Sequence, residues 1–297
     1  MEVNGGVRCM KIDSAGYSTV VDTPKDITAF KEIVNSNSVI IAGGTLLQIN
    51  WEAGGEKPSN LISVEHIPTL QRIEEVEIGS KRYLQIGACV TIAECLRNNA
   101  IKTFTPILAE ACLKIAAPAV RNRGTIGGNV CSKVGDTIPA LLTLDAILQF
   151  QDGAQNYSFP LVDWLKQPSN RTPELLTNIM IPIDLTSKNK VTFFQKVGRR
   201  ESFTAAIISI AGYVEYKDNL VQQVRLAIGG GAHQPCRLLQ VEKELSQKAI
   251  DNNDWLTIHK SIMEGFSSYT DPFVTAEYRK KVAANLFVAN LRKRINK

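Results

Sequence analysis

VRNRGTIGGNVCSKVGDTIPAL, residues 120–141, places two adjacent glycines between Thr125 and Asn129 and an aspartate, Asp136, seven residues further on. Glycine lets backbone N–H groups turn toward a ligand, and it lets a phosphate approach without a Cβ in the way. A carboxylate shortly after such a loop can accept hydrogen bonds from ribose hydroxyls. The alternative is structural: the glycines form a turn, and Asp136 is a turn-forming residue after Gly135.

A second glycine pair, Gly43-Gly44, follows the β-branched run from Val39 to Ala42. This run predicts a buried strand that ends in a tight turn. Two such loops could hold a pyrophosphate from both sides. Neither is a Walker loop, because no Gly-Lys-Ser/Thr follows, and neither matches the G-x-G-x-x-G dinucleotide fingerprint. On the residues alone, a pair of structural turns and an anion site both stay open.

Lys196 is a further candidate, because it lies at the end of an aromatic strand that begins at Thr192. Such a lysine could neutralise a charge on a cofactor, and the alternative is an edge-strand lysine that faces water. None of the three histidines lies in a metal-ligand spacing, and the sequence contains no G-x-S-x-G elbow. We therefore expect no catalytic residue of hydrolysis and no metal site on this chain.

The composition is that of an ordinary globular protein of about two domains, with 297 residues, 44% apolar and 21% charged. The six cysteines include no C-x-x-C pair, so neither a zinc site nor an iron–sulfur cluster has a ligand set. No apolar run reaches the roughly 20 residues that span a bilayer, and the start lacks the apolar core of a secretory signal. These features predict a cytoplasmic protein without a membrane span.

The net charge of +5 is concentrated at the end of the chain, where residues 279–297 contain seven Lys or Arg and no acid. The apolar residues of this stretch recur at helical spacing: Ala284, Phe287, Val288, Leu291 and Ile295. We therefore expect a terminal helix with a solvated basic face, and we expect no nucleic-acid partner.

The apolar patterns predict the remaining elements and the division into domains. Strands are expected at 61–64, 83–88, 144–150, 157–159, 175–181, 191–197, 205–216 and 220–228, and helices after Thr91, over 105–116 and over much of 236–297. The polar segment 184–190 is the best linker, so we place one domain at 1–186 and the second at 187–297. Strands followed by helices in the second domain are typical of an α+β fold.

Three ordered motifs together resemble the FAD-binding subunit of the molybdenum hydroxylases, the family of xanthine dehydrogenase, nicotinate dehydrogenase and aerobic carbon monoxide dehydrogenase. The motifs are Ile40 to Leu47, Ala117 to Asn129 and Gly135 to Leu141, and the resemblance covers nearly the whole chain. It implies an α+β FAD domain of the vanillyl-alcohol-oxidase type, followed by a smaller α+β domain like the C-terminal domain of the carbon monoxide dehydrogenase flavoprotein.

The resemblance also implies the residues that contact FAD. They are Ile40, Ile41, Ala42, Gly43, Gly44, Thr45, Leu46, Leu47, Ile115, Thr125, Ile126, Gly127, Gly128, Asn129, Asp136, Leu176 and Lys196. The two glycine-containing stretches would wrap the pyrophosphate. Asp136 would hold the adenosine side, Leu176 would contact the cofactor mainly through apolar and backbone groups, and Lys196 would approach the flavin end. Arg121 and Arg123 receive no role.

In such enzymes a molybdopterin cofactor on a large subunit hydroxylates the substrate, and two-iron iron–sulfur clusters on a small subunit pass the electrons to FAD. The resemblance therefore implies an oxidoreductase subunit in a heteromeric complex, with NAD(P)+ or another acceptor and a purine or another N-heteroaromatic substrate. Two alternatives stay open. One is a stand-alone flavin oxidoreductase of the vanillyl-alcohol-oxidase type, and the other is a non-catalytic nucleotide-binding module.

Overall fold

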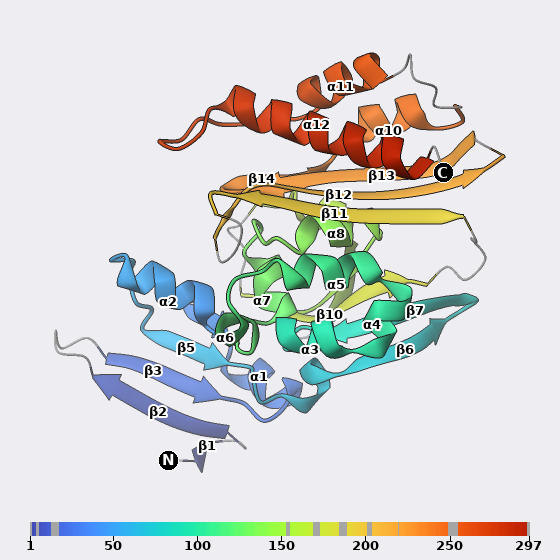
Figure 1. Ribbon diagram of the computed structural model, residues 1–297. Helices are drawn as coiled ribbons and strands as arrows, with labels where there is room; N and C mark the ends of the chain where they lie inside the picture. Colours follow the sequence, from blue (N-terminus) through green and yellow to red (C-terminus); the bar gives the residue numbers. More distant parts are fainter. Residues whose placement is uncertain are drawn as a thin grey trace.

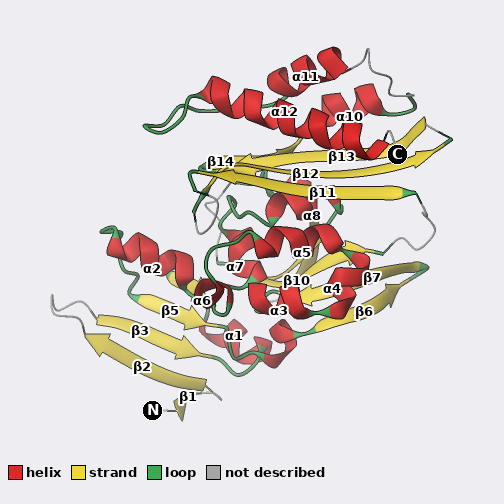
Figure 2. Cartoon of the chain, in the orientation of Figure 1, coloured by secondary structure: helices red, strands yellow, loops and turns green. Residues whose placement is uncertain are grey.

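The computed structural model describes residues 2–3, 6–12, 18–152, 155–168, 173–183, 189–200, 204–218, 220–248 and 255–295. These residues form three β-sheets, with helices between the second and third sheets and over the outer face of the third (Figures 1 and 2). The α+β class expected from the sequence is confirmed. The expected domain boundary between residues 186 and 187 lies outside the described residues.

The first sheet has the strand order β1-β2-β3-β5-β4. Its strands are β1 (Glu2–Val3), β2 (Gly6–Ile12), β3 (Ser18–Thr23), β5 (Asn60–Ser63) and β4 (Ser38–Ile41). β5 pairs in parallel with both β3 and β4. Because parallel strands need crossover connections, helices α1 (Ile27–Ile33) and α2 (Thr45–Glu52) lie between the strands in sequence. The Gly43-Gly44 pair therefore forms the turn from β4 into α2.

The second sheet is antiparallel, with the order β6-β7-β10-β8-β9. Its strands are β6 (Ile73–Ile78), β7 (Lys81–Gly87), β10 (Leu175–Pro182), β8 (Ile147–Asp152) and β9 (Gln155–Pro160). Short helices accompany it: η1 (Pro68–Gln71), α3 (Ile92–Arg97), α4 (Asn99–Phe104), α5 (Pro106–Leu113), α6 (Pro118–Arg121), α7 (Ile126–Cys131), α8 (Ile138–Thr143) and α9 (Leu161–Trp164). Six of these helices, α3 to α8, lie between β7 and β8 in sequence and include the motif quoted first.

Local sequence signals explain where the helices of this segment begin and end. The capping box expected at Thr91 is confirmed, because Thr91 Oγ1 accepts a bond from the Glu94 amide at 3.1 Å and Glu94 Oε2 accepts one from the Thr91 amide at 2.8 Å. The helix expected over 105–116 is shorter, since α5 ends at Leu113. Ala116 has a φ of 38°, in the left-handed region that helices exclude, so the last expected turn does not form.

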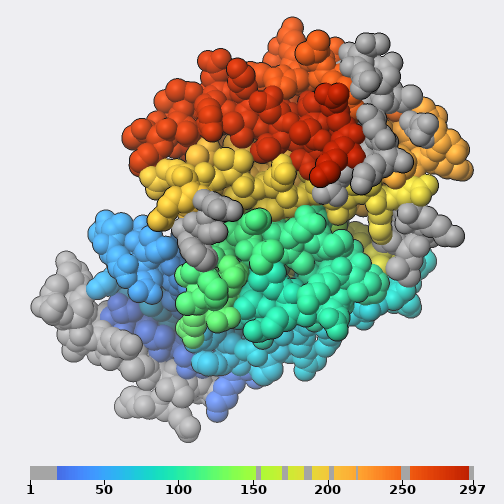
Figure 3. All heavy atoms as spheres, viewed as in Figure 1, coloured from blue at the N-terminus to red at the C-terminus, as the bar shows by residue number. Residues whose placement is uncertain are grey.

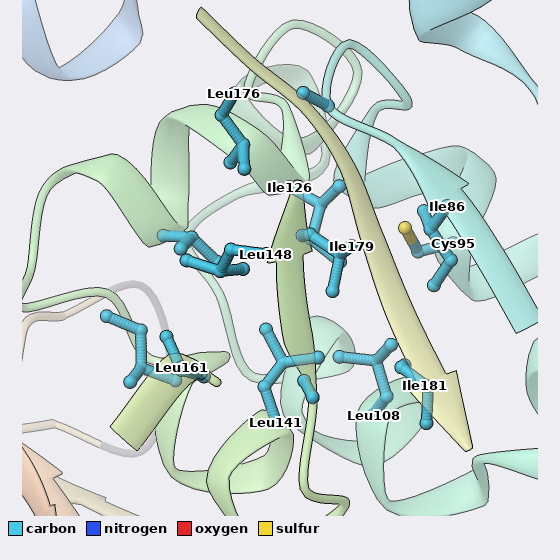
Figure 4. Packing of buried hydrophobic residues seen from close by; sticks show 14 of the residues in the cluster. Ile86, Cys95, Leu108, Ile126, Leu141, Leu148, Leu161, Leu176, Ile179 and Ile181 are labelled. Carbon is cyan, nitrogen blue, oxygen red and sulfur yellow. The ribbon is translucent and has the colours of Figure 1, made fainter. Parts of the chain in front are cut away.

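The main hydrophobic core lies between the second sheet and these helices (Figure 4). Ile179 and Ile181 of β10 pack there with Leu108 of α5, Ile126 of α7 and Leu141 of α8. All five side chains are fully buried, and burial of such a side chain contributes about 1.5–3 kcal/mol. This packing fixes α7 and α8, and with them the segment between Thr125 and Thr143, against a rigid sheet.

The third sheet is antiparallel, with the order β11-β12-β13-β14. Its strands are β11 (Lys190–Gly198), β12 (Ala206–Lys217), β13 (Leu220–Gly230) and β14 (His233–Arg237), and its helices are α10 (Leu239–Leu245), α11 (Trp255–Glu264) and α12 (Ala276–Ile295). The helices cover one face, where Phe193 of β11 meets Phe287 of α12. The apolar face expected for the terminal helix is confirmed by the burial of Ala284, Phe287 and Leu291.

The opposite face of the third sheet packs against α5 and α8 (Figure 1). Phe194 and Ala211 of the sheet are buried there with Ile107, Ala111 and Ala140 of the two helices. The first half of the chain and the second half therefore share a packed apolar interface. None of the helices within the described ranges is long and apolar enough to cross a membrane.

Candidate functional site

The two glycine-containing turns touch each other. A Cβ built on Gly43 would lie 1.8 Å from the carbonyl oxygen of Arg123, so only glycine fits at this crossing. A Cβ on Gly124 would lie 3.3 Å from Thr45 Oγ1. Two turns that are about 80 residues apart in sequence, as the numbers of Gly43 and Arg123 show, thus lie in direct contact. The proximity that two-sided binding of a pyrophosphate requires is present.

The first turn leads directly into a helix, which the sequence reasoning treated only as a loop. Gly44 adopts a φ of 69° and precedes α2, whose first turn has no side-chain cap. The first amide groups of a helix have no intrahelical acceptor and carry the positive end of its dipole, so they favour anions. Leu46 is 55% exposed and Ile49 is 62% exposed, and α2 stands at the surface in Figure 3.

The second turn is also the start of a helix. Thr125 caps α7, with its Oγ1 accepting a bond from the Gly128 amide at 3.1 Å. The two glycines differ in their surroundings. A Cβ on Gly127 would lie 2.5 Å from the carbonyl oxygen of Ala88, whereas a Cβ on Gly128 would meet only Thr125 Oγ1, at 3.1 Å. Gly127 is required by packing, but Gly128 is exposed and leaves open space where a ligand can approach the backbone.

Asn129 braces the loop that carries Asp136. Its Oδ1 accepts bonds from Thr137 Oγ1 at 2.6 Å and from the Thr137 amide at 3.1 Å. Gly135 packs so closely on Asn129 that a Cβ on it would lie 2.2 Å from the Asn129 carbonyl oxygen. The side-chain oxygen of Asn129 therefore bonds within the protein. It fixes the loop that carries Asp136 beside the start of α8.

Asp136 and Lys196 form an ion pair between the two halves of the chain. Lys196 Nζ lies 2.7 Å from Asp136 Oδ2 and 3.0 Å from the carbonyl oxygen of Lys114. Both side chains are largely buried, with 8% and 16% exposed. The resemblance assigns Asp136 to the adenosine side and Lys196 to the flavin end, and the ion pair brings the two side chains to one place. Their separate roles toward FAD stay a prediction.

Several of the expected contact residues belong to the hydrophobic core. Ile126 and Leu176 are buried, and the Leu176 side chain lies among core residues in Figure 4. The contact with FAD expected from Leu176 stays a prediction. Ile40 and Ala42 pack against a third core cluster, and Ile115 packs against the main one. These residues shape the turns, while Gly44, Thr45 and Gly128 expose main chain to a ligand.

The two arginines without an assigned role have structural partners. Arg121 Nη1 donates to the carbonyl oxygens of Ile115 at 2.8 Å and Ala116 at 2.7 Å, so it clamps the turn at the left-handed Ala116. Arg123 Nη2 lies 3.3 Å from Glu65 Oε2. The sequence reasoning missed the Arg121 clamp, because nothing in the residues 115–121 marks Ala116 as left-handed.

The described side chains include no group of three His, Cys, Asp or Glu residues that could hold a metal ion. What they do offer is two helix starts in contact, a Cβ-free approach at Gly128 and a buried cation at Lys196. This set fits a large anionic cofactor with a pyrophosphate, as FAD is. The arrangement is therefore that of a protein able to accept the pyrophosphate of a nucleotide cofactor.

The family follows from comparison with known proteins. Residues 14–184 match the family described as the FAD binding domain in molybdopterin dehydrogenase, and residues 193–293 match the CO dehydrogenase flavoprotein C-terminal domain. The chain belongs to this family and carries its FAD-binding domain, as the resemblance implied.

Relatives and solved structures agree with this assignment. The chain is 26% identical to the glyceraldehyde dehydrogenase medium chain of Sulfolobus acidocaldarius, over 84% of this chain and 87% of that one. It is 27% identical to the nicotine 6-hydroxylase medium subunit of Paenarthrobacter nicotinovorans, over 85% and 88%. A carbon monoxide dehydrogenase structure from Hydrogenophaga pseudoflava shares the fold, with a TM-score of 0.82, 23% identity and coverage of 92% and 96%.

Proposed function

We propose that this chain is the FAD-carrying electron-transfer subunit of a heteromeric molybdenum hydroxylase. The observation that carries the proposal is the contact between the two glycine turns, with Gly128 open to a ligand, in a chain of the FAD-binding family. Relatives named as a medium chain and a medium subunit support a place in a multi-subunit enzyme. A medium subunit needs partners, whereas the stand-alone oxidoreductase would not.

The residues divide into two functional groups. Main-chain amides at the start of α2 would bind the pyrophosphate, because no side chain caps them and they carry the positive end of a helix dipole. The first amides of α7 already bond within the protein, so α7 would contribute the open approach at Gly128. Lys196, which pairs with Asp136 in this structure, would approach the flavin end, and Asp136 would lie beside the bound cofactor. FAD itself supplies the redox chemistry, and the protein places the cofactor and tunes it. The apolar interface between α5, α8 and the third sheet would exclude water from that end.

The partners and the acceptor extend the proposal. A large subunit would hold the molybdopterin cofactor, a small subunit would hold two-iron iron–sulfur clusters, and NAD(P)+ would accept the electrons. The named relatives act on an aldehyde and on nicotine, which supports substrate choice on another subunit. A purine or another N-heteroaromatic compound is our proposed substrate. We also propose a cytoplasmic location and a domain boundary between residues 186 and 187, in the interval between the two family matches.

Reconstitution of the purified full chain with FAD tests the proposal. The chain should bind FAD with a flavin absorbance spectrum, and the loaded chain should catalyse NADH-dependent reduction of an artificial acceptor. A chain that stays colourless after incubation with FAD would overturn the proposal. Flavin binding without any reaction with NADH or NADPH would remove NAD(P)+ as the acceptor. Copurification from the native source without a molybdenum or iron protein would favour the stand-alone oxidoreductase.

A further inference from the structure

Lys196 belongs to a row of residues on the face of the third sheet that meets α5 and α8. The strand register pairs Lys196 of β11 with Ser209 of β12, and Ser209 with Gly229 of β13. Side chains alternate across a strand, and Phe194 and Ala211, two residues along, are buried against α5 and α8. Lys196, Ser209 and Gly229 therefore face the first half of the chain.

The segment from Asp136 to Pro139 crosses over this row. Asp136 binds Lys196 at one end of the row, and a Cβ on Gly229 would lie 3.0 Å from Pro139 Cγ at the other end. Ser209 lies between them. Side chains directly opposite in an antiparallel pair have Cβ atoms about 4.5–5.5 Å apart, so the Ser209 hydroxyl is a close neighbour of the Lys196 side chain.

Ser209 is fully buried, and its Oγ has no hydrogen-bond partner among the described residues. A buried hydroxyl without a partner is costly, and such a group in a native structure needs an explanation. Packing does not explain it, because the neighbouring positions on the same face, Ala211 and Ala227, are filled by alanine without a hydroxyl. The hydroxyl is therefore expected to serve a state in which it has a partner.

We propose that Ser209 is a positioning residue for bound FAD, acting through Asp136 and Lys196. The inference rests on the proposed function. When Lys196 turns toward the cofactor, Asp136 loses its 2.7 Å partner inside the interface. A buried carboxylate left without a cation is strongly destabilising, and a hydroxyl donor offsets part of this cost. The Ser209 hydroxyl donates to Asp136 in that state, and so leaves the lysine free for the flavin end.

The role makes Ser209→Ala distinct from an ordinary core substitution. In the FAD-free chain the variant should be as stable as wild type or more stable, because an unpaired hydroxyl is removed. With FAD, its affinity should fall by about twofold to tenfold, since one hydrogen bond is lost. Thr143→Val is the matched control. Its buried hydroxyl lies on α8 and already donates to the Ala140 carbonyl oxygen, so this variant should lose stability and keep FAD affinity.

The experiment compares wild type, Ser209→Ala, Lys196→Met and the double variant. Urea denaturation gives the free energy of unfolding without FAD, and titration with FAD, followed by fluorescence quenching, gives the affinity. Because Ser209 acts through the ion pair, its substitution should matter little once Lys196 is absent. The FAD affinities of Lys196→Met and of the double variant should therefore agree within about twofold. Full additivity of the two substitutions would overturn the inference. So would unchanged FAD affinity in Ser209→Ala, or a loss of FAD-free stability as in Thr143→Val. Failure of wild type to bind FAD would instead overturn the proposed function.

Discussion

Lys196 Nζ and Asp136 Oδ2, which come from the two halves of the chain, lie 2.7 Å apart in an interface that buries most of both side chains. The lysine is on β11 of the third sheet, and the aspartate precedes α8, whose core packing is fixed by the second sheet. The pair thus joins the two parts of the molecule at the place where the flavin end of the cofactor is proposed to lie. It also explains why a lysine at the end of an aromatic strand does not face water.

Removing only the cation should be more damaging than removing both charges. Lys196→Met leaves Asp136 charged and without a cation, which typically costs about 3–5 kcal/mol at buried sites. In the double variant Lys196→Met/Asp136→Asn no charge is left unpaired, so its free energy of unfolding should lie closer to that of wild type. Urea denaturation of the FAD-free proteins measures this. Equal stability of the single and double variants would show that the pair is not electrostatically coupled.

A second ionic group also links the two halves of the chain. Arg237 of β14 binds Glu242 at 2.6 Å and Asp145 at 2.8 Å, and Arg225 binds Asp145 at 2.6 Å. Glu242 is buried and also accepts the Leu226 amide. Arg237→Leu should therefore lower the free energy of unfolding by about 3–5 kcal/mol. Asp145 is 45% exposed, so Asp145→Ala should cost about 1 kcal/mol or less.

These two variants are read out by urea denaturation under the same salt conditions. If Asp145→Ala lowered the free energy of unfolding as much as Arg237→Leu, the ion pairs of Asp145 between the halves, rather than the buried pair of Arg237 with Glu242, would contribute most of the stability.

His233 gives stability a dependence on pH. Burial lowers the pKa of its ring below the usual value, and Arg279 acts in the same direction. Below the unfolded pKa of about 6.5, the unfolded chain binds a proton that the folded chain does not, so stability falls as the pH drops from there toward the folded pKa. In His233→Gln this contribution to the change of unfolding free energy with pH should be absent. Unfolding free energies measured between pH 7.5 and pH 5 at about half-unit steps would detect it. Parallel curves for both proteins would contradict the assignment.

The sequence predicted the regular elements well where local signals agree with packing. The Thr91 capping box, three of the four strands of the third sheet and the apolar face of the last helix all appear, whereas β14 was not predicted. Each depends on residues within a few positions of one another, which a pattern can register. The end of α5 was wrong because Ala116 is left-handed through a clamp by Arg121, and the partners of that clamp cannot be identified from spacing.

The sequence led to a set of candidate site residues but not to their arrangement. The glycine pairs and the acid were found by their chemistry, yet the contact between Gly43 and Arg123 depends on how two distant turns pack. The pairing of Asp136 with Lys196 and the unpaired Ser209 hydroxyl depend on the register of β11 and β12 and on the docking of α8. These are tertiary facts, so a single sequence carries no local signal for them.

FAD affinity of Gly128→Leu, measured beside Gly127→Ala, tests most directly whether the glycine turns hold the pyrophosphate. A Cβ at Gly128 would meet only Thr125 Oγ1, at 3.1 Å, and a longer side chain there would occupy the space proposed for the phosphate. We predict wild-type unfolding free energy and a loss of FAD affinity of about tenfold or more, or ~1.4 kcal/mol. Gly127→Ala should instead destabilise the fold, because its Cβ would lie 2.5 Å from the Ala88 carbonyl oxygen. Unchanged FAD affinity in a folded Gly128→Leu protein would contradict the account.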